Sequence, residues 1–248
     1  MGTAEVDNDA ALRSTALQPI GVVGGMGIFG AAGLLLWGVT HGLIPAVAAR
    51  SGAEPVLLWF LFAGLGVFLP LVVAAHVILL REGRRAAWSS ERLRFRRPTR
   101  NDWLWSAAAL VAIGLLTVLS VAAVSMFSEE APLQPSFLRM EPLGLGRYWI
   151  LAAWLPFWVL NIASEELLWR GVLLPRQEVA LGRAAWIANG AGWLLFHLPF
   201  GPMILLPLWP TAFILPYVVQ RTKNSSAGVL IHAGLNGPAF LAVAFGLV

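Results

Sequence analysis

Long, nearly uncharged apolar runs constrain this chain more than any other feature. They cover about residues 20–48, 55–80, 103–127, 148–174, 184–198, 203–219 and 227–248. A membrane-spanning helix needs about 20 consecutive, mainly apolar residues, because the hydrocarbon core of a bilayer is about 30 Å thick. Charged residues make up only 12% of the chain, whereas soluble domains carry about 25%. The sequence therefore predicts an all-α, polytopic membrane helix bundle of about seven transmembrane helices.

The positive charge of the chain is concentrated in the links between these runs. Residues 81–102 hold eight arginines and three acidic residues, a net charge of +5. The links after the fourth and sixth runs also carry an excess of Arg and Lys. Because cytoplasmic loops of membrane proteins are enriched in these residues, we expect all three links and the N-terminus to be cytoplasmic, and the C-terminus to be external. Charge placed this way is not the pattern of a nucleic-acid-binding surface.

Ionisable and amide side chains interrupt three of the apolar runs, where each costs at least about 2.5 kcal/mol near a helix centre. The fourth run ends with Glu165, Glu166 and, four residues later, Arg170. The fifth run ends with His197, and the last contains His232 and Asn236. Such residues in a membrane helix indicate a functional site unless they only pair with one another.

Helical geometry gives these side chains different directions. Glu166 and Arg170 are four residues apart, so they share a helix face and can pair. Glu165 lies about 100° further round the helix and is free to face a cavity. His232 and Asn236 also share a face. We expect one polar cavity, lined by Glu165, His197, His232 and Asn236 and open to the cytoplasm, with Glu165 about 15 Å from the Arg176 end of its helix.

Water activation is the chemistry that fits this set of residues. A carboxylate can accept a proton from water while an imidazole orients the water molecule. A second imidazole and an amide can donate hydrogen bonds to a developing oxyanion. The chain has no cysteine, which excludes thiol chemistry and disulfides, and no Ser lies in a recognisable nucleophile motif.

The three motifs resemble those of the CAAX protease and bacteriocin-processing (CPBP) family of intramembrane glutamate endopeptidases. They are Glu165-Glu166-x-x-x-Arg170, an aromatic-x-x-x-His written here Trp193 to His197, and His232-x-x-x-Asn236. The resemblance covers about residues 149–240. Trp193 departs from the commoner Phe, and we expect that position to pack.

The resemblance implies a role for each residue. Glu165 would be the general base on the attacking water, and His197 would help to position that water. Glu166 and Arg170 would orient and stabilise the site, whereas His232 and Asn236 would form the oxyanion hole. The substrate would be a membrane-associated, possibly lipidated, protein or peptide, and no cofactor or metal is implied.

Two alternatives remain open from the sequence. Two histidines and a glutamate could hold a zinc ion with one open position, although no His-Glu-x-x-His is present and Arg170 would repel a cation. A metal-dependent membrane protease could therefore use the same Glu and His residues. The second alternative is a non-catalytic membrane scaffold or a bacteriocin-immunity-type protein that retains the site as a relic.

The sequence also predicts an organisation into three parts. Residues 1–19 are mostly polar or small and form a cytoplasmic tail without the pattern of a cleavable signal peptide. Residues 20–147 form N-terminal transmembrane helices, with the basic cytoplasmic loop 81–102, and residues 148–248 form a catalytic transmembrane core. We expect an integral protein of a bacterial cell membrane, with the bilayer and a substrate as partners and with no prediction of oligomeric state.

Overall fold

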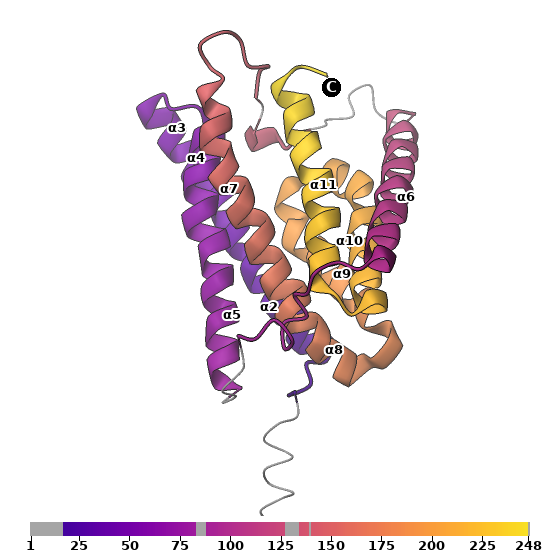
Figure 1. Cartoon of the computed structure of the whole chain (residues 1–248). Helices are drawn as coiled ribbons and strands as arrows, with labels where there is room; N and C mark the ends of the chain where they lie inside the picture. Colours follow the sequence, from indigo (N-terminus) through magenta and orange to yellow (C-terminus); the bar gives the residue numbers. More distant parts are fainter. Residues whose placement is uncertain (1–16, 83–87, 127–133, 139, 248) are drawn as a thin grey trace, which may run out of the picture.

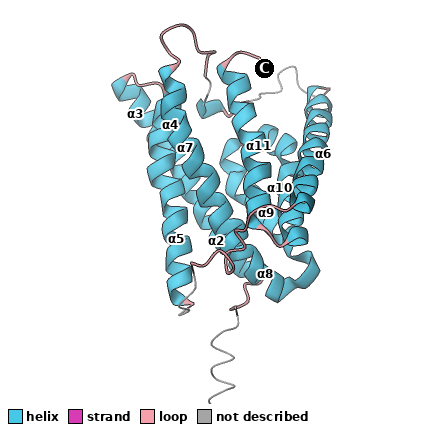
Figure 2. Ribbon diagram, in the orientation of Figure 1, coloured by secondary structure: helices cyan, strands magenta, loops and turns pink. Residues whose placement is uncertain are grey.

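The computed structural model describes residues 17–82, 88–126, 134–138 and 140–247 of the chain, and every regular element in them is helical (Figure 2). The predicted all-α fold is confirmed. Most of the predicted tail 1–19, together with Arg84 and Arg85, lies outside the described residues. The helices are α2 (Val22–Trp37), η1 (Gly38–Leu43), α3 (Ile44–Ser51), α4 (Pro55–Ala63), η2 (Gly64–Phe68), α5 (Leu69–Arg81), α6 (Arg100–Ser125), η3 (Ser136–Leu138), α7 (Trp149–Glu165), η4 (Glu166–Leu173), α8 (Leu174–Leu181), η5 (Gly182–Ala184), α9 (Ala185–His197), η6 (Leu198–Phe200), α10 (Pro202–Thr222) and α11 (Ser225–Ala244).

Within the described residues, six continuous helical runs are long and apolar enough to cross a membrane, where the sequence predicts about seven. The difference lies in the run Trp149–Phe200, which has 52 residues. At 1.5 Å per residue it would be about 78 Å long if straight, far more than a bilayer core. The chain instead folds back at Gly182, whose φ of 55° lies in the left-handed region that glycine adopts without penalty. The predicted fourth and fifth spans are thus the two arms of one helical run.

The helices form a single bundle in which both halves of the sequence interleave (Figure 1). α2, from the N-terminal half, packs along α9, and α6 packs along α10 and α11. Glycines allow the first of these contacts, since a Cβ at Gly192 would overlap the Phe29 ring and a Cβ at Gly33 would lie 3.2 Å from Leu195 O. Close approach of backbones at small residues is typical of helix pairs in membranes. Helices from both sides of residue 147 therefore pack against one another.

The outer surface of the bundle is apolar. Leu34, Leu119 and Val118 are 73%, 64% and 67% exposed, respectively, although large apolar side chains in a soluble protein would be mostly buried. Such a surface suits hydrocarbon rather than water. Together with the six apolar runs, it supports the prediction of an integral membrane protein.

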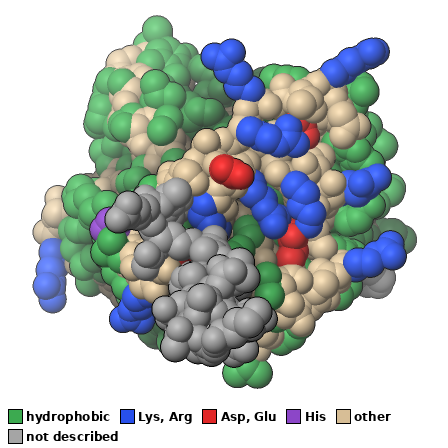
Figure 3. All heavy atoms as spheres, turned by 60° about the horizontal axis from the view of Figure 1, so that its bottom comes forward, with side chains coloured by type: hydrophobic (Ala, Val, Ile, Leu, Met, Phe, Trp, Pro, Cys, Tyr) green, Lys and Arg blue, Asp and Glu red, His purple; other side chains and the backbone are tan. Residues whose placement is uncertain are grey.

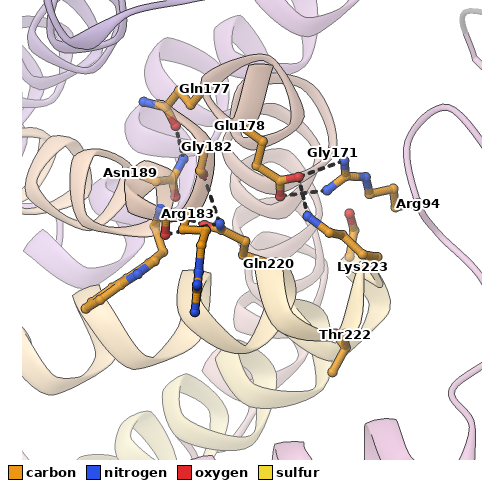
Figure 4. Close-up of polar contacts among 12 residues, drawn as sticks. Arg94, Gly171, Gln177, Glu178, Gly182, Arg183, Asn189, Gln220, Thr222 and Lys223 are labelled. Carbon is orange, nitrogen blue, oxygen red and sulfur yellow. Dashed lines mark hydrogen bonds and ion pairs between the residues drawn. The ribbon is translucent and has the colours of Figure 1, made fainter. Parts of the chain in front are cut away.

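Positive charge gathers at the end of the bundle where α5 ends and α6 begins (Figures 1 and 3). The three basic links meet there, since Glu178 pairs with Arg94 at 2.8 Å and also with Lys223 (Figure 4). Arg96 donates to the Thr222 carbonyl at 2.9 Å. The structure thus confirms that these links share one end, which we call the arginine-rich face. The C-terminus lies at the opposite end (Figure 1).

Candidate active site

Three helical segments bring the predicted polar residues together in the interior. Glu165 ends α7, His197 ends α9, and His232 lies within α11. Their exposed fractions are 1%, 7% and 4%. Because burying such groups is costly without partners, the contacts that each one makes indicate its role.

The Glu165 carboxylate is held by two neutral donors. Asn161, one turn earlier on α7, donates from Nδ2 to Oε1 at 2.9 Å. Trp193 of α9 donates from Nε1 to Oε2 at 2.6 Å. Each carboxylate oxygen has two lone pairs, so both oxygens can still accept a hydrogen bond from a water molecule or a ligand.

Glu166 points away from Glu165, as the 100° step between them predicts. Its Oε1 lies 3.2 Å from Arg170 Nη1 and 2.9 Å from His232 Nδ1. Both Glu166 and Arg170 are fully buried. A Cβ at Gly228 of α11 would overlap the other oxygen of Glu166, so only glycine leaves room for this carboxylate. Glu166 therefore links the first and third motifs directly.

The segment that carries Glu166 and Arg170 is π-helical. η4 begins directly after Glu165, and π-helical turns often occur at functional sites. Side chains from outside the segment hold its carbonyl groups, since Asn189 donates to Trp169 O at 3.0 Å and Arg92 to Gly171 O at 3.0 Å. The second bond ties η4 to the basic link 81–102, a connection that the sequence does not reveal.

The hydrogen bond of His197 fixes which ring nitrogen can act as a base. Nδ1 lies 2.9 Å from the Trp193 carbonyl oxygen. A carbonyl can only accept, so Nδ1 carries the proton, and Nε2 of the neutral ring is left as an acceptor. An acceptor nitrogen at this position suits the orientation of a water molecule.

Trp193 lies at the centre of this cluster. Its ring centroid is 4.1 Å from that of His197 and 5.9 Å from that of His232. The Arg170 guanidinium carbon lies 5.5 Å from the same ring. We expected Trp193 to pack, and it does, but it also donates to Glu165, as a phenylalanine could not. Sequence reasoning assigned no role to Asn161 either, although its position four residues before Glu165 was a usable signal.

A cavity of about 630 Å³ opens onto this cluster. Its polar lining includes the four predicted residues, Glu165, His197, His232 and Asn236, with Asn161 and Trp193 beside them. Glu166 and Arg170 do not line it, because they lie behind Glu165 in the packed interior. The remaining wall is largely apolar and aromatic. The expectation of one shared cavity is met.

The lining of the cavity extends toward one end of the bundle. The cavity is lined by the second half of α6, from Ile113 to Val124, and by the first half of α10, from Met203 to Thr211. Both stretches lie toward the end opposite the arginine-rich face. That the cavity opens to the cytoplasm stays a prediction, because the lining does not show from which side of a membrane the cavity is reached.

The described residues offer no set of three or more His, Asp or Glu side chains grouped closely enough to hold a metal ion. His232 uses Nδ1 on Glu166, and His197 uses Nδ1 on a carbonyl. The contacts of Glu165 are with an amide and an indole. This arrangement gives no support to the metal-dependent alternative.

Fold and site together define an integral membrane protein that holds a carboxylate–imidazole cluster at the end of an internal cavity. Residues 147–237 match the family model described as type II CAAX prenyl endopeptidase Rce1-like. The match includes all six predicted site residues, confirms the resemblance to the CPBP family over this segment and supports an intramembrane protease role. No curated protein and no solved structure matches the chain.

Proposed function

We propose that this protein is an intramembrane endopeptidase in which Glu165 activates the water that cleaves a peptide bond. One observation carries the proposal: Glu165 lines the same cavity as the imidazoles of His197 and His232, while two neutral donors orient its carboxylate. A general base needs this geometry before its basicity matters. In a structural ion pair, Glu165 would be paired with a cation. Arg170, the cation of this cluster, is paired with Glu166 instead.

The proposed reaction assigns a task to each group. A water molecule donates hydrogen bonds to Glu165 and to Nε2 of His197, and its oxygen attacks the substrate carbonyl carbon as Glu165 takes the proton. The negative charge that develops on the carbonyl oxygen is stabilised by donors from His232 and Asn236. Glu165 then returns the proton to the amide nitrogen, and the C–N bond breaks. The proton that remains on the attacking oxygen passes to the amine, so the products are a carboxylate and an ammonium group.

Glu166 and Arg170 support the oxyanion site from behind in this scheme. Glu166 accepts from Nδ1 of His232, which fixes the orientation of the ring with Nε2 on the side away from Glu166. Arg170 shares the same Glu166 oxygen and orients that carboxylate. Their roles are positioning roles, because neither residue lines the cavity.

The test is Glu165→Gln, which keeps the shape of the side chain but removes the base. Membrane proteins of cells with the wild-type and the variant protein are compared for new N- and C-terminal ends, and the substrates found are then assayed with the reconstituted protein. General-base catalysis contributes about 10²- to 10⁴-fold, so we expect at least a hundredfold loss of cleavage. Glu141→Gln, an exposed position outside the site, is the matched control.

Two results would redirect the assignment. Equal cleavage by wild-type and Glu165→Gln protein would favour the non-catalytic scaffold. Loss of cleavage in the presence of a chelator, restored by a divalent metal, would favour the metal-dependent alternative.

A further inference from the structure

The α10 wall of the cavity carries a polar side chain that belongs to none of the three motifs. The residues of α10 that line the cavity are Met203, Ile204, Pro207, Leu208 and Thr211. This spacing places them on one face of the helix, so Thr211 points toward the same space as its apolar neighbours. Thr211 is only 7% exposed, and a hydroxyl group buried to this extent normally has a hydrogen-bond partner.

The Thr211 hydroxyl lacks the bond that two other helical threonines make. Thr40 and Thr222 each donate to the carbonyl four residues earlier, at 2.8 Å. The corresponding carbonyl for Thr211 is that of Pro207, which accepts from Thr117 of α6 at 3.1 Å. Among the described residues the Thr211 oxygen has no partner, and it is not one of the fully enclosed polar atoms of the interior. The hydroxyl is therefore open to the cavity and can bond to a ligand there.

The packing of α10 on α11 places Thr211 at the height of Asn236. A Cβ at Gly228 of α11 would lie 3.0 Å from the Val219 side chain of α10, so these two residues face each other. The two helices are antiparallel neighbours joined by the short link 223–224. Thr211 and Asn236 each lie eight residues further from that link, which is about 12 Å along both helices. Both residues line the cavity, so Thr211 lies at the level of the proposed oxyanion site.

A peptide held for cleavage presents backbone groups on both sides of the scissile bond. Consecutive residues of an extended peptide are about 3.4 Å apart, whereas the axes of packed helices are about 8–10 Å apart. A hydroxyl on α10 and an amide on α11 at the same height can therefore contact peptide groups that are close together in the substrate. A hydroxyl can donate to a carbonyl or accept from an N–H, and an ordinary peptide bond offers both groups.

We propose that Thr211 is a substrate-binding residue whose hydroxyl forms a hydrogen bond with a backbone peptide group within about two residues of the scissile bond. This bond holds the substrate against α10 while the scissile carbonyl lies between Glu165 and the donors of His232 and Asn236. A contact with the backbone is independent of the side chains of the substrate. The inference rests on the proposed function, because it assigns a further residue to that reaction.

Thr211→Val tests this role, since valine is also branched at Cβ but has no hydroxyl. The probe is a synthetic peptide that spans a cleavage site found by comparing wild-type and Glu165→Gln cells. A substrate peptide group left unpaired should lower kcat/KM about ten- to a hundredfold, whereas Thr211→Ser, which keeps the hydroxyl, should retain most of the activity. Thr222→Val removes a hydroxyl of α10 that bonds to Val218 O and does not line the cavity, so it is the matched control.

A second measurement separates contact with the substrate from a structural role. Peptides are made in which one amide near the scissile bond is replaced by an ester, which has no N–H and a weaker carbonyl acceptor. At the position that Thr211 contacts, the ester should lower kcat/KM of the wild-type protein at least about tenfold, but that of Thr211→Val less than about threefold, because groups in contact give non-additive effects. The melting temperature of Thr211→Val should not decrease, since its hydroxyl has no partner among the described residues.

The outcomes distinguish this inference from the proposed function. A wild-type kcat/KM in Thr211→Val, or ester effects that are equal in the two proteins at every position, would overturn the role of Thr211 and leave the role of Glu165 standing. Wild-type cleavage by Glu165→Gln would instead overturn the proposed function.

Discussion

At the scale of single residues, the donor from Trp193 distinguishes this site from the pattern that its motifs resemble. An indole provides the packing surface of a phenylalanine and adds one N–H group. Here that group lies 2.6 Å from Glu165 Oε2. The bond fixes the carboxylate relative to α9, so the base on α7 and the imidazole of His197 keep one geometry.

Replacing Trp193 by Phe should therefore slow cleavage with little change in folding. A hydrogen bond to a charged group contributes about 1.5–3 kcal/mol, so we expect a decrease in kcat of about ten- to a hundredfold. The measurement is single-turnover cleavage with the reconstituted protein. Trp186→Phe, in which the altered ring packs on Phe213 and Tyr217 away from the site, should cleave normally. A Trp193→Phe variant with the wild-type rate would show that the indole N–H is dispensable.

At the scale of elements, the basic link 81–102 holds the π-helical segment η4 in place. Arg92 donates to Gly171 O within η4 and pairs with Glu82 at the end of α5. Burial acts to raise the pKa of Glu82, but the hydrogen bonds and charges of Arg92 and Arg176 outweigh it and hold the pKa below its ordinary value of 4.5. A lowered pKa in the folded state stabilises the protein above pH 4.5, and this contribution is lost as the pH falls below that value.

Glu82→Gln should consequently lower stability at neutral pH and weaken its dependence on pH below 4.5. Breaking a buried ion pair costs about 3–5 kcal/mol, so we expect a clear decrease in the melting temperature of the detergent-solubilised protein. Glu54 pairs with Arg147, but the Glu54 side chain is 42% exposed, so Glu54→Gln should have a small effect. An acid-induced decrease in melting temperature that is identical in wild-type and Glu82→Gln protein would exclude Glu82 as its source.

At the scale of the whole molecule, the two ends of the bundle differ in charge. The basic links gather at one end (Figures 1 and 3), whereas the C-terminus lies at the other (Figure 1). Positive loops remain on the cytoplasmic side because their transfer across the membrane is disfavoured. The distribution of charge thus predicts the orientation of the entire bundle.

Reporter fusions test this orientation. Alkaline phosphatase, which is active only after export, should be active when fused after Val248 and inactive when fused within residues 88–91. A fluorescent protein that folds only in the cytoplasm should give the reverse pattern. The same reporter active at both positions would contradict an arrangement in which the two positions lie on opposite sides.

The sequence by itself determined the helical membrane fold, the alternating placement of the basic links and the six residues of the cluster. It could do so because apolar runs must satisfy their backbone hydrogen bonds as helices, and because isolated polar groups in such runs are too costly to occur without partners. Only the tertiary structure decided that Trp193 and Asn161 hold Glu165, that Glu166 joins His232, and that Glu166 and Arg170 lie outside the lining of the cavity. Those features depend on how helices distant in sequence rotate and pack against one another, which helical periodicity leaves free.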